Sequence, residues 1–151
     1  YLGGTGVGGG TLMGLSKKML GLDTIGHIDE FAKSGVIENV DLKVSDLSKK
    51  NAGLRGDLTA ANFGRVSDIA SKNDIALGLV NMVFETVGMM AVFASRQYGI
   101  SDIVFTGNLT QMSQTQSVVD MFNRSFETNI IVPENAQYST VIGAAISYFI
   151  K

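Results

Sequence analysis

The chain has 151 residues, of which 45% are hydrophobic and 17% are charged, and its formal net charge is −2. This length suits one folded domain with a hydrophobic core, and the composition excludes a disordered chain. The near-balanced charge gives no electrostatic footprint for nucleic acid or for an anionic membrane surface. With no cysteine, the sequence offers neither disulfides nor thiolate metal sites, and a cytoplasmic location is expected.

A glycine-rich segment stands near the start of the sequence: residues 3–10 are GGTGVGGG, and a helical pattern follows from Thr11. Glycine lets backbone amides approach an anion closely, and the start of a helix adds unpaired N–H groups and a partial positive charge. The segment therefore predicts a phosphate-binding loop. A flexible loop or a tight hairpin turn is the alternative.

Two common phosphate motifs fit this segment poorly. Residues 4–9 match the dinucleotide-binding pattern G-x-G-x-x-G, which also needs an acidic residue at the end of a second strand about 20 residues later. Asp23 and Asp29 stand near that spacing, but both fall at the boundary of an expected helix or inside it. The Walker motif requires Gly-Lys-Ser/Thr, and Gly10 is followed instead by threonine and leucine.

Two short helices are expected after the glycine-rich segment. The first covers Thr11–Leu20 and ends at Gly21, and the second is capped by Thr24 and stops at residues 34–35. Farther along, residues 57–64 (DLTAANFG) are expected to form a loop or turn of small residues.

The longest periodic segment is Asn73–Gln97, which has an apolar stripe along one face and few polar residues on the opposite face. A helix of this kind lies in the centre of a core or crosses a membrane. Asn81 and Glu85 stand near its middle, and no excess of basic residues flanks it. These features favour a long buried helix, with a membrane span as the alternative.

Strand and helix patterns alternate in the last third of the chain. A short buried strand is expected at 102–106, a helix around Val118–Phe122, a second strand at 130–132 and a final helix at Ser139–Ile150. This order predicts an α/β architecture with adjacent parallel strands. The inward face of the final helix is expected to consist of Val141, Ile142, Ala145, Ile146 and Phe149.

Gly107 and Asn108 follow the first of these strands. Ligands of open α/β sheets bind beyond the carboxyl ends of the strands, so this pair could meet a nucleotide. An ordinary strand-to-helix turn is the alternative. Gly143 is expected to allow close packing of the final helix.

The sequence contains one histidine, His27, which stands beside Asp29 and Glu30 on an expected amphipathic helix. A catalytic triad or a histidine-based metal site would have to use it, and the sequence suggests no second ligand. A solvated helix face is therefore expected, and no metal site is predicted. Three aspartates are expected to be surface charges or helix-start residues: Asp41, Asp46 and Asp57.

Five segments together carry a resemblance to a known family. In chain order they are residues 3–15 (GGTGVGGGTLMGL), 39–44 (NVDLKV), 57–64 (DLTAANFG), 102–108 (DIVFTGN) and 138–145 (YSTVIGAA). Together they resemble the C-terminal half of the type II (staphylococcal-like) and eukaryotic pantothenate kinases, and the resemblance covers nearly the whole chain. Several segments in the same order are far more specific than any one of them.

The resemblance implies a fold and an activity. The fold would be the actin-like ATPase (ribonuclease H-like) fold of the superfamily of acetate kinase and actin, with residues 1–151 as a single nucleotide-binding C-terminal lobe. The activity would be phosphorylation of pantothenate to 4′-phosphopantothenate by ATP with Mg²⁺, the first step of coenzyme A biosynthesis. The resemblance also implies a homodimer.

Site residues follow from the matching positions. Ile25 matches a hydrophobic position beside the nucleotide, and Asn108 matches a small polar residue after the strand glycine. Thr59, Ala60 and Phe122 fall where the family lines a tunnel for the pantothenate arm across the dimer interface. The family's loop-and-helix contact to ATP matches these residues: Gly6, Gly8, Gly9, Gly10, Thr11, Leu12 and Met13.

The sequence also departs from the family pattern. The catalytic glutamate and the first phosphate loop of the family belong to its N-terminal half, which is expected to be missing here, so this chain alone is expected to be inactive. An arginine that usually stands two residues before the first glycine of the loop is Tyr1 in this sequence. Two alternatives stay open: another kinase of the superfamily, such as an N-acetylglucosamine kinase, or a regulatory lobe without catalysis.

Overall fold

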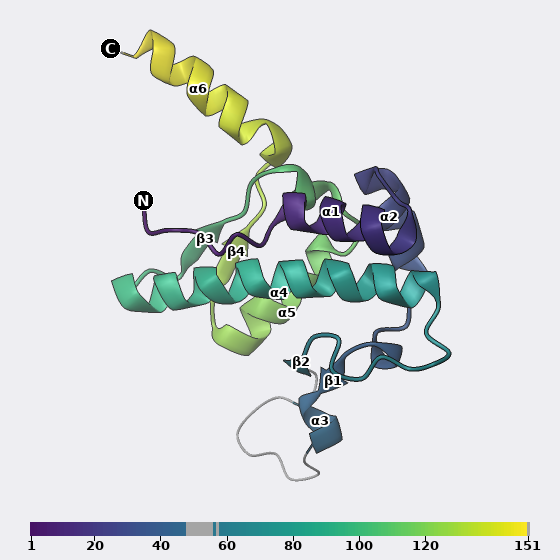
Figure 1. Cartoon of the computed structure of the whole chain (residues 1–151). Coiled ribbons are helices and arrows are strands. Elements are labelled where there is room, and N and C mark those ends of the chain that lie inside the picture. The colour runs from purple at the N-terminus through teal and green to yellow at the C-terminus, as the bar shows by residue number, and fades with distance from the viewer. Residues whose placement is uncertain (48–55, 57, 151) are drawn as a thin grey trace. The chain divides into compact units, whose positions relative to one another are not determined.

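The computed structural model of the chain describes residues 1–47, 56 and 58–150 (Figure 1). These residues form two compact units. The N-terminal unit consists of Gly4–Thr86, and the C-terminal unit consists of Val87–Lys151 together with Tyr1–Gly3. The long helix α4 (Lys72–Tyr98) contributes its first part to the N-terminal unit and its second part to the C-terminal unit.

Two helices begin the N-terminal unit, as the sequence predicts. α1 (Gly9–Leu20) ends at Gly21, whose positive φ of 75° gives the left-handed conformation that commonly ends a helix. α2 (Ile25–Lys33) begins after Thr24, whose hydroxyl accepts the backbone N–H of His27 at 3.2 Å. The predicted end of α1 and the predicted start of α2 are confirmed, but α1 starts two residues earlier than the apolar pattern indicated.

A small antiparallel ladder follows the two helices. After the turn η1 (Ile37–Asn39), β1 (Leu42–Lys43) pairs with β2 (Thr59–Ala61), and the one-turn helix α3 (Val44–Leu47) follows β1 directly. The prediction of a loop at residues 57–64 is therefore wrong for β2. The pairing is so short that it leaves no alternation of apolar residues to detect, and Asp57 lies outside the described residues.

The core of the N-terminal unit forms on the first part of α4. Gly78 of α4 faces the side chains of Val40 and Phe63, so the absence of a Cβ permits close approach there. The buried apolar side chains of this unit are Leu12, Leu20, Ile28, Ala32, Val40, Ala76, Leu79, Val80, Val83 and Phe84. Their spacing along α4 confirms the predicted core helix over this part.

The start of α4 is fixed by a capping box. The Ser71 N–H donates to Oδ2 of Asp74 at 2.8 Å, and the Asp74 N–H donates to Oγ of Ser71 at 3.2 Å. The same buried carboxylate also accepts the N–H of Val36 at 2.7 Å and the amide of Asn39 at 3.1 Å. Burial raises the pKa of Asp74, but these hydrogen bonds together outweigh it and lower the pKa from 3.8 to about 2.

The C-terminal unit contains a parallel strand pair joined by a helix, as the sequence predicts. β3 pairs with β4 so that Ile103 lies opposite Ile130, and α5 lies between them in the chain (Figure 1). The elements after α4 are β3 (Asp102–Val104), η2 (Asn108–Gln111), α5 (Thr115–Phe126), β4 (Asn129–Ile131), η3 (Ala136–Tyr138) and α6 (Ser139–Phe149).

Burial in this unit differs from the expectation at two elements. β3 is only partly buried, because Val104 is 59% exposed while Phe105, just after the strand, is buried. The expected inward face of α6 is wrong, and an added Cβ at Gly143 would meet nothing within 4 Å. A hydrophobic pattern tells which face favours burial, but not which surface covers it. The exposed apolar residues of α6 include Val141, Ile142, Ala145, Ile146 and Phe149.

Among the described residues, α4 is the one helix that is long and apolar enough to cross a membrane, with a mean hydropathy of 1.8 in its most apolar stretch. The protein itself buries 44% of that stretch. Asn81 and Glu85, in the middle of the helix, are hydrogen-bonded within the N-terminal unit. These contacts favour the core-helix interpretation, since polar groups facing lipid would lack such partners.

We expect Asp74→Asn to destabilise the protein by about 1–2 kcal/mol at neutral pH, because the variant loses the charge that strengthens three hydrogen bonds to the carboxylate. The folded pKa of Asp74 is lower than its ordinary value. Its contribution is therefore fully present above pH 3.8 and is lost as the pH falls toward 2. Urea unfolding of wild type and variant at several pH values should show this difference shrinking between pH 5 and pH 2, and a constant difference would contradict it.

In the C-terminal unit, Gly88 of α4 packs closely against the ring of Phe122 on α5. An added Cβ at Gly88 would clash with the buried ring of Phe122. Gly88→Leu should therefore lower the free energy of unfolding by about 1–3 kcal/mol through overpacking. Gly14→Leu is the control, since Gly14 is exposed on α1 with open space around it. Thermal unfolding should leave that control at least as stable as wild type, because leucine favours a helix over glycine.

Candidate functional site

The glycine-rich segment forms a loop that leads into the N-terminus of α1. Gly6 has φ +72°, a conformation that side chains other than glycine rarely adopt. Gly8 is extended and immediately precedes the first helical residue, Gly9. The predicted order of loop and helix is therefore present, and the alternative of a hairpin turn is excluded, because the loop continues into a helix rather than into a returning strand.

Thr11 organises this loop. Its hydroxyl donates to the carbonyl of Gly6 at 2.9 Å and accepts the N–H of Gly8 at 3.3 Å. Earlier in the loop, the hydroxyl of Thr5 accepts the N–H of Val7 at 3.0 Å. Two threonine hydroxyls thus hold a segment that glycine alone would leave with many accessible conformations.

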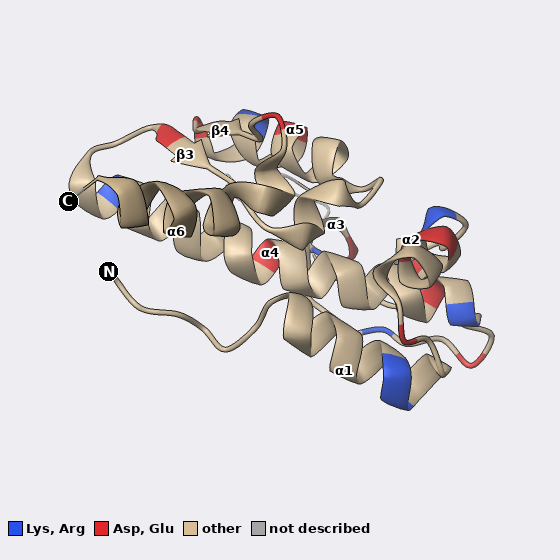
Figure 2. Cartoon of the chain, turned by 90° about the horizontal axis from the view of Figure 1, so that it is seen from above, with Lys and Arg blue, Asp and Glu red and all other residues tan. Residues whose placement is uncertain are grey.

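The start of α1 is open to a ligand. A Cβ added at Gly8 or Gly10 would meet no atom within 4 Å. α1 has no acidic residue in its first turn, and its lysines lie in its last turn, as Figure 2 shows. The dipole of α1 and its first N–H groups are therefore the source of positive potential at this end, which suits an anion such as a phosphate.

Other residues predicted to contact ATP in this unit take different positions. Leu12 is fully buried, and its N–H donates to the carbonyl of Gly8 at 3.0 Å, so Leu12 supports the loop from the core. Met13 is half-buried on α1, and Ile25 is half-buried at the first position of α2. The roles predicted for these residues at a nucleotide stay predictions.

Asn108 belongs to the C-terminal unit. It follows Gly107, which has φ +102° and donates its N–H to the carbonyl of Ala136 at 2.9 Å. The hydroxyl of Thr110 donates to the carbonyl of Gly107 at 2.7 Å. Asn108 itself is exposed, as a residue that contacts a ligand must be, although its predicted contact with ATP stays a prediction.

The three residues predicted to line a tunnel for the substrate are also divided between the units. Thr59 is half-buried and Ala60 is exposed on β2 of the N-terminal unit. Phe122 is buried on α5 of the C-terminal unit, where its ring lies 5.4 Å from that of Phe126. Thr59 and Ala60 can therefore reach a ligand from this chain, whereas Phe122 packs inside its own unit.

The sequence did not predict a buried polar network that contacts Thr59. Asp41, expected at the surface, is fully buried, and its carboxylate accepts the N–H of Phe63 at 2.8 Å and the amide of Asn81 at 2.8 Å. Asn62 donates to Oδ2 of Asp41 at 3.4 Å and to Oε2 of Glu85 at 2.9 Å. The available signal was Asn81 and Glu85, two strongly polar residues near the middle of a largely apolar helix.

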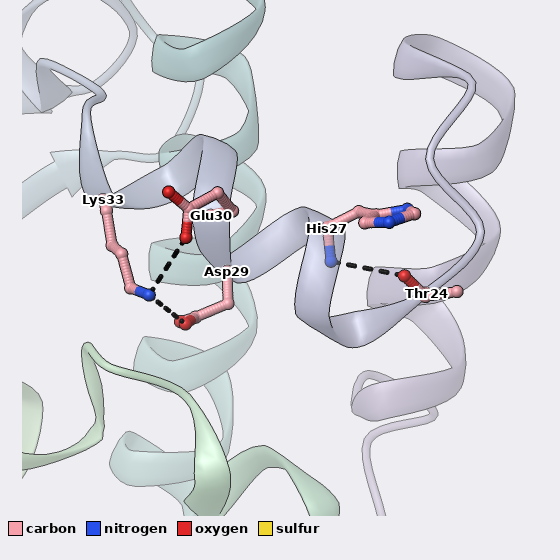
Figure 3. A network of polar contacts seen from close by, with 5 residues as sticks. All are labelled: Thr24, His27, Asp29, Glu30 and Lys33. Atoms are coloured by element: carbon pink, nitrogen blue, oxygen red, sulfur yellow. Dashed lines mark hydrogen bonds and ion pairs between the residues drawn. The ribbon is translucent and has the colours of Figure 1, made fainter.

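Asp46 and His27 behave as expected of surface residues. Asp46 is exposed and pairs with Arg65 at 3.2 Å. The imidazole of His27 lies apart from the charged cluster on α2, in which Nζ of Lys33 lies 3.2 Å from a carboxylate oxygen of Asp29 and 3.2 Å from one of Glu30 (Figure 3). Hydrogen bonds to Asp29 and Glu30 raise the pKa of Lys33. Exposed pairs of this kind contribute little stability.

Residues 1–147 match the profile of the Fumble family. The chain is 31% identical to the type II pantothenate kinase of Staphylococcus epidermidis over 152 residues, which cover 95% of this chain and 56% of that protein. It is 32% identical to the type II pantothenate kinase of Oceanobacillus iheyensis over 148 residues, with shares of 95% and 56%. The chain is 30% identical to the type II pantothenate kinase of Bacillus cereus over 149 residues, which cover 95% of this chain and 55% of that protein.

The chain thus spans little more than half the length of the curated relatives that it matches. The family match, in contrast, covers nearly all of the chain. The resemblance carried by the five sequence segments is therefore confirmed, and the chain belongs to the Fumble family, the family of the type II pantothenate kinases.

Proposed function

We propose that this chain is the nucleotide-binding half of an enzyme that transfers a phosphoryl group from ATP to pantothenate, the first step of coenzyme A biosynthesis. The observation that carries the proposal is the match along 95% of the chain to relatives named type II pantothenate kinase. The open glycine loop at the start of α1 supports it, because a phosphoryl transfer requires a site that holds phosphate.

In this proposal the ATP phosphates lie against the loop between Gly6 and Gly10. Backbone N–H groups donate to the phosphate oxygens, and the positive end of the α1 dipole offsets part of their charge. Thr11 holds the loop in its binding shape before ATP arrives, through its hydrogen bonds to Gly6 and Gly8. A pre-shaped loop lowers the entropy lost on binding. Within the same unit, Ile25 at the first position of α2 would add an apolar contact to the nucleotide.

A Mg²⁺ ion bound with ATP at this loop would be held mainly by the phosphates. No group of three or more histidine, aspartate or glutamate side chains among them is arranged to hold a metal ion. Mg²⁺ usually binds through one or two carboxylates together with the phosphates of the substrate. We therefore assign no step in this chain to Mg²⁺.

The proposal extends to the fold of the lobe and to the oligomeric state of the enzyme. We infer an actin-like ATPase lobe whose partner lobe carries the catalytic glutamate, in a cytoplasmic homodimer that brings Thr59 and Ala60 to the pantothenate arm. The parallel pair β3 and β4 and its connecting helix α5 are compatible with such a lobe.

The first test is enzymatic. The intact gene product, incubated with ATP and Mg²⁺, should release ADP and form 4′-phosphopantothenate when pantothenate is supplied. N-acetylglucosamine, the substrate type of a related class of kinases, should give no ADP above the background without acceptor. Turnover of the amino sugar instead of pantothenate would reject the proposal.

The second test addresses the loop. Gly10→Val should raise the KM for ATP by at least about tenfold, because a side chain would stand where the phosphates approach the backbone. The folded state should tolerate the change, since nothing lies within 4 Å of an added Cβ. Gly14→Val is the matched control on the same helix, with equal space around it. Equal effects of both variants on the KM for ATP would contradict the assigned phosphate site.

A further inference from the structure

The last helix, α6, is exposed along almost its whole length. Every residue from 141 to 150 is exposed, and the large apolar side chains in this stretch range from 46% exposed for Ile142 to 81% exposed for Phe149. The helix sequence, STVIGAAISYF, contains no charged residue. An uncharged helix of 11 residues is at best marginally stable in water unless it packs against other elements. α6 therefore requires a covering surface that the described part of the chain does not supply.

The apolar residues of α6 form a broad face. At 3.6 residues per turn, they cover about half of the helix circumference, and the remainder carries glycine and hydroxyl side chains. A contact between two single helices uses a narrower stripe. The breadth of the apolar face therefore favours a folded lobe as its cover over one helix of a second copy of this chain. The residues of the face are Val141, Ile142, Ala145, Ile146, Tyr148 and Phe149.

The start of α6 is fixed within the C-terminal unit. The turn η3 leads directly into α6, and its first residue, Ala136, is buried and accepts the N–H of Gly107 at 2.9 Å through its carbonyl. In Figure 1, α6 extends from this turn away from β3 and β4 of the same unit. A helix whose first turn is already fixed loses little entropy when a partner surface covers it.

The relatives contain additional chain that can provide this cover. The match covers 95% of this chain but 56% of the staphylococcal protein, so a large part of that relative lies outside the match. Tyr1–Gly3 belongs to the same unit as α6. In a longer gene product, residues before Tyr1 would therefore leave from the unit that carries α6. A lobe tethered there is present at a high effective concentration near the helix.

We propose that the apolar face of α6 is the docking surface for the partner lobe of the intact enzyme, which is formed by residues that precede Tyr1 in the gene product. The complementary surface of that lobe is apolar and uncharged, because a charge placed against α6 would be buried without a partner. The inference rests on the proposed function, which includes the partner lobe, and it adds the element of this chain that holds that lobe.

The test places the photoreactive residue p-benzoylphenylalanine at position 149 of the intact gene product, where it replaces the similar ring of Phe149. Irradiation should join this position to a peptide that precedes Tyr1, in a product with the mass of a single chain. The same replacement at Thr140 is the matched control. It should give about tenfold less of that product, because Thr140 and Phe149 lie on opposite sides of the helix.

Three other outcomes would overturn the inference. A product with twice the mass would show that a second copy covers α6. A cross-link to residues 102–132 would show that α6 packs on its own unit, and the absence of any cross-link would show that α6 stays uncovered. The readout does not depend on catalysis: the expected cross-link in a protein that does not phosphorylate pantothenate would reject the proposed function alone, and an active enzyme without it would reject the inference alone.

A pair of neighbouring substitutions tests the same face through stability. Ile146→Asp should lower the Tm of the intact gene product by at least about 5 °C, because the charge would be buried against the partner lobe. Ser147→Asp is the control on the other side of α6 and should lower the Tm by about 2 °C or less. Both residues are exposed in this chain. Equal shifts for the two variants would therefore mean that nothing covers Ile146 in the intact protein, against the proposal.

Discussion

The buried carboxylate of Asp41 is the constraint on which the arrangement of the N-terminal unit depends. A carboxyl group without solvent is costly unless N–H donors surround it, and here Phe63, Asn62 and Asn81 supply them. Those donors come from the segment after β2 and from α4, so satisfying one carboxylate fixes two distant segments at once. The position of Thr59 follows, because its hydroxyl accepts from the same amide that holds Asp41.

A second carboxylate complements this constraint at the start of α4. Hydrophobic burial is not directional, and a helix that is apolar almost all round could turn about its axis at little cost. Asp74 ties the first turn of α4 to the segment around Val36, and Asn81 ties the helix two turns later to Asp41. Two polar contacts on one helix define its rotation, which apolar packing alone leaves open.

Local features of this fold could be predicted from the sequence, and long-range ones could not. The ends of α1 and α2 depend on Gly21 and Thr24, whose backbone preferences act within one turn. The parallel pair follows from the alternation of strand and helix patterns. Asp41 escaped detection because its partners lie 21 to 40 residues away, and an aspartate between apolar residues has the same local pattern whether it is buried or exposed. The exposure of α6 escaped for the same reason, since a pattern does not specify its partner surface.

The same difference between local and long-range features applies to the candidate site. A phosphate loop is built from backbone amides, so its mark in the sequence is the glycine that lets the backbone approach an anion, and residues 3–10 carry that mark plainly. The positions of individual side chains depend on pairing between distant segments: Lys43 lies beside Thr59, 16 residues away in the sequence. A single cation of this kind has no local pattern. A glycine-rich loop is therefore the feature that sequence reasoning reaches first, while the β1–β2 ladder and its buried network become visible only in the structure.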